Sequence, residues 1–149
     1  MHIEQASLDD LPALCDLLNA LFTIEQDFHP DQSRQMRGLT LLLQDGDRAA
    51  IMVARDQDQV IGMVSAQLVI STAEGAPSAW VEDMVVLEQW RGQGTGHALL
   101  DHVLAWAREK GATRSQLLVD LDNAPALAYY DHLGWQSTRL AARRLNLKD

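Results

Sequence analysis

The sequence has little cysteine and no long apolar run. Its one cysteine, Cys15, cannot form a disulfide within the 149 residues or a cysteine-based metal cluster. We interpret Cys15 as a core residue, because it falls on the apolar side of a predicted helix. The apolar runs are much shorter than the ~20 residues of a membrane-spanning helix, and the acidic N-terminal segment is unlike a signal peptide. We therefore expect a soluble, cytoplasmic protein that does not bind membranes.

Basic residues are also scarce, at 12 Lys and Arg against 21 Asp and Glu. Residues 1–74 hold 4 basic and 12 acidic residues (net −8), and residues 75–149 hold 8 and 9 (net −1), which together give the net charge of −9. Such an acidic chain repels the nucleic-acid backbone and attracts small cations, so nucleic acid is not an expected partner. The five histidines show no ligand spacing, so no metal is expected.

The periodicity of the chain predicts one α/β domain over residues 1–149. Hydrophobic residues make up 47% of the sequence, which suffices for one core. The predicted strands are 2–5, 50–54, 60–70, a central strand within 80–90, 115–120 and 135–147. The predicted helices are 11–22, 32–44, a helix from about Thr95 to Lys110, and a helix capped by Asn123 and closed by Gly134. Gly62 is expected to mark a bulge or a close approach.

The central strand leads through a glycine-rich turn into a helix. Gly92, Gly94 and Gly96 allow successive backbone N–H groups to converge, and a helix N-terminus beside them favours an anion. The turn therefore predicts a site for a phosphorylated ligand. It is not a P-loop, because no Gly-Lys-Ser/Thr follows, and it is not a dinucleotide fingerprint, because His97 stands where the third glycine is needed.

Two motifs resemble one known family. Arg91-x-x-Gly94-x-Gly96 resembles the coenzyme A pyrophosphate loop of the GNAT superfamily of N-acetyltransferases, and the stretch from Asn123 through Tyr130 to Gly134 resembles that family's second signature. The resemblance covers almost the whole chain. It implies the GNAT fold, with a mixed central sheet of six or seven strands, about four helices and a V-shaped splay between the two central parallel strands.

The resemblance also implies a reaction and a cofactor site. The reaction is transfer of an acetyl group from acetyl-CoA to an amine by direct attack. Met84 and Val86 would offer backbone hydrogen bonds to the pantetheine arm. The implied cofactor-binding residues are Met84, Val85, Val86, Arg91, Gly92, Gln93, Gly94, Thr95, Gly96, Asn123 and Tyr130.

The chemistry requires a base and an acid. The attacking amine must be neutral, so Glu82 is expected to take its proton directly or through a water. Strand alternation would set Glu82 and Asp83 on opposite faces unless a bulge intervenes. The pair resembles the Glu-Asp of diamine and spermidine/spermine N-acetyltransferases. The alternative is that Glu82 pairs with an arginine. Tyr130 is expected to protonate the departing sulfur, and Tyr129 to pack in the core.

The acceptor is underdetermined by the sequence. Glu25 and Asp27 are expected to bind it together with Glu82, or else to be solvated loop acids. A small cationic amine is favoured, and the alternatives are an amino acid, an aminoglycoside-like amine or a protein N-terminus. A non-catalytic acyl-CoA sensor is a further alternative. A homodimer is expected, with the final strand as its edge.

Overall fold

The computed structural model describes residues 1–24 and 29–148 of the chain. The chain forms two compact units, Met1–Leu117 and Leu118–Asp149. Each unit is built from its own elements, and the first unit holds the sheet.

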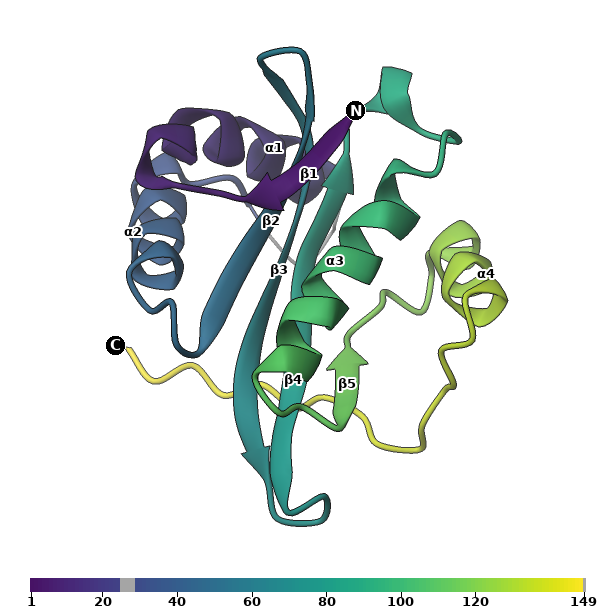
Figure 1. The fold of residues 1–149 in the computed structure, drawn as a ribbon. Coiled ribbons are helices and arrows are strands. Elements are labelled where there is room, and N and C mark those ends of the chain that lie inside the picture. Colours follow the sequence, from purple (N-terminus) through teal and green to yellow (C-terminus); the bar gives the residue numbers. More distant parts are fainter. Residues whose placement is uncertain (25–28, 149) are drawn as a thin grey trace. The chain divides into compact units, whose positions relative to one another are not determined.

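The first unit is organised around a mixed sheet in the order β1-β2-β3-β4-β5 (Figure 1). The strands are β1 His2–Gln5, β2 Ala49–Asp56, β3 Gln59–Ser71, β4 Ala76–Val86 and β5 Arg114–Leu117. The pairs β1–β2, β2–β3 and β3–β4 are antiparallel, and the pair β4–β5 is parallel. The α/β class is therefore confirmed, with five strands among the described residues rather than six or seven.

Helices cover both faces of this sheet. They are α1 Leu11–Ile24, α2 Gln32–Leu43 and α3 Thr95–Glu109. In Figure 1, α3 crosses in front of the strands, and α1 and α2 lie on the opposite side. Because side chains alternate along a strand, Val53 and Met63 join the core under α1 and α2, whereas their neighbours face α3.

Gly62 lies where β3 approaches α3. A Cβ added there would lie 3.1 Å from Leu99 Cδ1 and 3.1 Å from the Val85 carbonyl oxygen. The predicted close approach at Gly62 is confirmed. The space that a side chain would take is filled by α3.

The second unit contains one helix, α4 Ala124–His132. Asn123 caps it, because its side chain accepts a hydrogen bond from the Ala126 N–H at 3.1 Å. At the other end, Gly134 has φ +93°, and Trp135 N–H donates to the Tyr130 carbonyl at 3.0 Å. This is the glycine-terminated ending expected from the sequence.

Two strand predictions need correction. The segment 135–147 was expected to form a final strand, and the described residues of that segment form none. A strand needs a partner for its backbone groups and an apolar face. The segment is largely exposed, and Ala141, Ala142, Arg143 and Arg144 interrupt its apolar alternation. In addition, β5 ends at Leu117 instead of residue 120, and its residues are exposed or half-buried.

Arg55 ties β2 to the N-terminal segment. Its guanidinium donates to the Glu4 carboxylate, and its Nη2 donates to Asp10 Oδ2 at 2.8 Å. Asp10 is 8% exposed and also accepts a hydrogen bond from the Ser7 N–H at 2.9 Å. Burial raises the pKa of the Asp10 carboxyl, but the hydrogen bonds from Arg55 and Ser7 outweigh it and hold the pKa below its usual value.

Replacing this carboxylate should destabilise the fold in a pH-dependent way. Asp10→Asn leaves part of the Arg55 guanidinium without its charged acceptor, so we expect a loss of about 1–3 kcal/mol at neutral pH. Because the pKa is lower in the folded state than the ~3.9 of an unfolded aspartate, the stabilisation is full above that value and is lost as the pH falls through the folded pKa.

Urea denaturation of both proteins at pH 7 and at about pH 2 measures the effect. The two curves should differ at the higher pH and converge at the lower. A difference of the same size at both pH values would show that the Asp10 charge is not the stabilising feature.

Candidate functional site

A bulge interrupts β4 at the predicted catalytic position. Ser65 pairs with Glu82 and Met63 pairs with Val85, so Asp83 and Met84 together oppose Val64. Asp83 adopts the left-handed region, with φ +55°. The bulge shifts the alternation of side chains at this point, and bulges of this kind re-aim side chains beside functional sites.

Glu82 lies on the face of β4 that α1 and α2 cover, because its partner Ser65 pairs in turn with the core residue Ile51. Its side chain is exposed. The Trp80 indole N–H donates to Glu82 Oε1 at 2.6 Å. No lysine or arginine among residues 1–24 and 29–148 forms an ion pair with Glu82, so the alternative of an arginine partner is not realised there.

The edge of β4 that faces β5 is paired only at its start. The last β4–β5 pair is Val81 with Leu117, so residues 82–86 extend beyond it. The Leu87 N–H donates to the Ile61 carbonyl on the β3 side. The N–H and C=O groups of the preceding residue, Val86, therefore point to the opposite edge of β4, the edge that faces β5. The Val86 carbonyl accepts a hydrogen bond from Arg91 Nε at 2.9 Å. Met84 lies within the bulge, and Val85 is a buried core residue.

The glycine loop leads directly into α3. Gly92 has φ +76°, and Gly94, the N-cap of α3, has φ +83° with no side-chain cap on the helix. The first helical bond runs from Ala98 N–H to the Gly94 carbonyl at 3.0 Å. The N–H groups of Thr95, Gly96 and His97 therefore have no acceptor within the helix.

This loop fits a phosphate group. A Cβ built at Gly92 or Gly94 meets no atom within 4 Å, so there is open space above the loop. Free N–H groups, the positive end of the helix dipole and the Arg91 guanidinium all favour an anion. Thr95 is 2% exposed and can contribute through its backbone N–H, whereas the Gln93 side chain turns back to the Gln89 carbonyl at 3.4 Å.

His97, which stands in place of a third glycine after the loop, is exposed. Its Nε2 lies 3.5 Å from Asp101 Oδ2, one turn along α3. Trp80 is not among the site residues predicted from the sequence. The i, i+2 spacing of Trp80 and Glu82, which sets two side chains on one face of a strand, is the signal that could have indicated it.

Asn123 and Tyr130 belong to the second unit. The Asn123 side chain is the N-cap of α4. The Tyr130 ring is half-buried and makes edge-on contacts with Tyr129 and Trp135, at centroid distances of 5.4 and 6.0 Å. Their roles in the cofactor site stay predictions. Glu25 and Asp27 lie outside the described residues.

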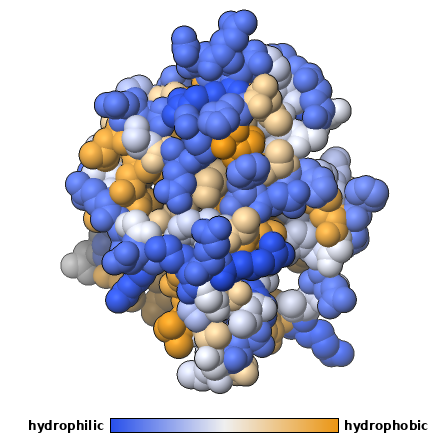
Figure 2. Space-filling view, viewed as in Figure 1, coloured by the Kyte–Doolittle hydropathy of each residue, from blue (hydrophilic) through white to orange (hydrophobic). Residues whose placement is uncertain are grey.

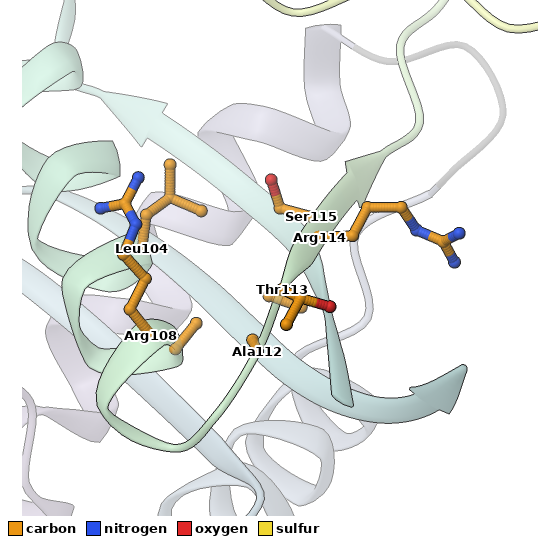
Figure 3. Close-up of a pocket in the computed structure, with 8 residues that line it drawn as sticks. Leu104, Arg108, Ala112, Thr113, Arg114 and Ser115 are labelled. Atoms are coloured by element: carbon orange, nitrogen blue, oxygen red, sulfur yellow. The ribbon is translucent and has the colours of Figure 1, made fainter. Parts of the chain in front are cut away.

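A cavity of about 110 Å³ lies between α3 and β5 (Figure 3). Its lining residues are Ala79, Leu104, Ala107, Arg108, Ala112, Thr113, Arg114 and Ser115. The cavity is at the C-terminal end of α3, whereas the glycine loop is at the N-terminal end. In Figure 3 the Arg114 side chain extends away from α3. None of the predicted site residues lines this cavity.

The face shown in Figure 2 is mainly hydrophilic, with apolar residues in small separate groups. Within the described part of the chain, no helix is both long enough and apolar enough to cross a membrane. The same residues contain no group of three or more His, Cys, Asp or Glu side chains that could hold a metal ion.

Residues 11–135 match the model of the Acetyltransferase (GNAT) family. The chain is 27% identical over 139 residues to "Aminoglycoside N(6')-acetyltransferase type 1" of Stenotrophomonas maltophilia, covering 91% of this chain and 86% of that protein.

Solved structures agree in fold. A possible acetyltransferase from Clostridium difficile 630 superposes with a TM-score of 0.87 at 18% identity, covering 99% of this chain and 98% of that one. A predicted acetyltransferase with acetyl-CoA from Clostridium acetobutylicum superposes with a TM-score of 0.79 at 18% identity, covering 98% and 96%.

Proposed function

The chain belongs to the acetyltransferase (GNAT) family and uses acetyl-CoA, and we propose that its acceptor is the amine of a small cationic molecule. One observation carries the proposal. The same strand, β4, presents Glu82 and then leads through the glycine loop into the uncapped N-terminus of α3. One segment of the chain thus carries first a carboxylate that suits a cationic acceptor and then an anion site that suits a phosphorylated donor.

The residues of this segment fit the cofactor. The N–H groups from Gly92 to Gly96 and the Arg91 guanidinium would hold the pyrophosphate. The outward backbone edge at Met84 and Val86, with Val85 between them, would hold the pantetheine arm. Asn123 and Tyr130 would approach the cofactor from the second signature. When bound, acetyl-CoA supplies an acetyl group activated as a thioester.

The chain's residues then move two protons. Glu82 takes the proton of the attacking amine, directly or through a water, as the nitrogen bonds to the acetyl carbon. The Trp80 N–H already donates to Oε1, which favours Oε2 as the oxygen that receives the proton. The Tyr130 hydroxyl protonates or hydrogen-bonds the sulfur as the carbon–sulfur bond breaks.

The charge distribution supports a cationic acceptor. Residues 1–74, which include Glu25 and Asp27, carry net −8. The relative from Stenotrophomonas maltophilia is an aminoglycoside acetyltransferase, and aminoglycosides are polycationic amines. An aminoglycoside-like amine is therefore the first acceptor to test, followed by the diamines that the Glu82-Asp83 pair suggests. Amino acids and protein N-termini are the remaining alternatives.

A screen for thiol release from acetyl-CoA separates these possibilities. Aminoglycosides, diamines, amino acids and peptides are offered in turn, and a non-catalytic acyl-CoA sensor would release thiol with none of them. Cytoplasmic location and a homodimer stay predictions from the sequence. Light scattering on the purified protein measures its mass in solution and so tests for the homodimer.

Gly94→Val should abolish acetyl-CoA binding while the protein remains folded. The valine side chain would project into the open space above the loop, at a backbone conformation with φ +83°. Gly75→Val is a matched control, because Gly75 also has a positive φ (+66°) and open space, but lies in the β3–β4 turn. Calorimetry should show lost affinity only for Gly94→Val. Equal affinity in both variants would remove the loop from the site.

Binding of the acceptor should depend on the Glu82 charge. Glu82→Gln should raise the KM for a cationic amine and lower kcat, because the variant lacks both the attraction and the base. In the parent enzyme, added salt should also raise KM, since it screens partly exposed charges. Steady-state kinetics at low and high ionic strength measure both effects. A preference for neutral amines with no salt dependence would exclude a cationic acceptor but not acetyl transfer.

Tyr130→Phe should lower kcat by about 10²–10⁴ while acetyl-CoA affinity is nearly unchanged, because the variant keeps the ring and loses only the hydroxyl. Tyr129→Phe is the control one residue away and should keep kcat within a few-fold of the parent. Equal small effects of the two changes would mean that another group protonates the sulfur.

A further inference from the structure

We propose that Trp80 is a positioning residue for Glu82. Its indole N–H fixes one oxygen of the carboxylate and leaves the other to receive the proton of the amine. The proposal rests on the proposed role of Glu82 and adds a residue that acts only through it.

The geometry of the pair is that of a charge-assisted hydrogen bond. Trp80 Nε1 lies 2.6 Å from Glu82 Oε1, and such bonds to an ionised acceptor are shorter and stronger than neutral ones. The two residues are two apart on β4 and pair with Gln67 and Ser65 of β3, so both side chains stand on the same face of the sheet. The Trp80 side chain is half-buried, which limits its own motion.

Glu82 is held at a second point through its backbone. The Ser65 hydroxyl donates to the Glu82 carbonyl oxygen at 3.1 Å, and Ser65 is 1% exposed. The bulge at Asp83 and Met84 follows immediately. An exposed glutamate on a strand would otherwise sample several rotamers, and a base must be aligned with the proton that it accepts. The backbone contact and the indole contact together restrict the carboxylate.

The chemical type of the partner matters. An indole N–H is a donor only, carries no charge and does not ionise at physiological pH. An arginine or lysine in its place would neutralise the carboxylate and repel a cationic acceptor. Trp80 can therefore orient Glu82 while its negative charge remains available to the amine.

Trp80→Phe tests the proposal, because it keeps an aromatic ring and deletes the N–H. We expect kcat/KM for the preferred amine to fall about tenfold, mainly through kcat, with acetyl-CoA affinity unchanged. The same change is made in the Glu82→Gln background. In that background Trp80→Phe should have little further effect, because the carboxylate that Trp80 positions is already removed.

The double-mutant cycle separates the possible outcomes. A loss of the same size in both backgrounds would mean that Trp80 only packs, and the proposal would be wrong. Normal kinetics of Trp80→Phe beside a defective Glu82→Gln would also overturn it, while the proposed function stands. Normal kinetics of Glu82→Gln would instead overturn the role of Glu82.

A second measurement avoids the Trp80 variant. The four tryptophans give four indole N–H signals in a ¹H–¹⁵N spectrum. Glu82→Gln should shift one of them strongly, because its acceptor changes from a carboxylate to an amide, and a cationic acceptor added to the parent protein should shift the same signal. If no indole signal responds to Glu82→Gln, the contact is absent in solution and the proposal fails.

Discussion

The break in the β4 ladder is the feature on which the candidate site depends. An unbroken antiparallel pair with β3 would continue the alternation of side chains through Glu82, Asp83 and Met84. The bulge places two residues against Val64 and puts Asp83 at φ +55°. Val85 therefore returns to the core on the same face as Glu82, the face covered by α1 and α2. Strand pairing with β5 ends at the same level, with the pair of Val81 and Leu117.

The position of α3 determines the other half of the site. Leu99 packs where Gly62 leaves room, and this contact brings α3 close to the sheet. The helix is anchored by buried apolar residues on its inner side, among them Leu100 and Val103. Its N-terminus carries neither a capping side chain nor intrahelical acceptors for its first N–H groups. A helix end that is rigidly packed but uncapped is well suited to an anion, because its donors are oriented before the ligand arrives.

Two acidic side chains of the first unit are held in different ways. Asp10 is nearly buried and is paired with the charged Arg55, which lowers the pKa of Asp10 despite burial. Glu82 is exposed and accepts from the neutral Trp80 indole. The first arrangement neutralises a charge and joins β2 to the N-terminal segment. The second gives a carboxylate a hydrogen bond from a neutral donor, which leaves its negative charge uncompensated.

Much of the local structure could be predicted from the sequence, because it depends on patterns of a few neighbouring residues. The glycines between β4 and α3, the Asn123 cap and the Gly134 ending follow from backbone rules that act over a few residues. The predicted strand at 135–147 was wrong, since a strand exists only where a partner binds its backbone groups. Pairing between β3 and β4 decided both the side on which Glu82 stands and the bulge at Asp83, which brings Val85 to that same side. The Trp80–Glu82 contact likewise required the tertiary structure, because i, i+2 spacing brings two side chains to one face but does not make them bond.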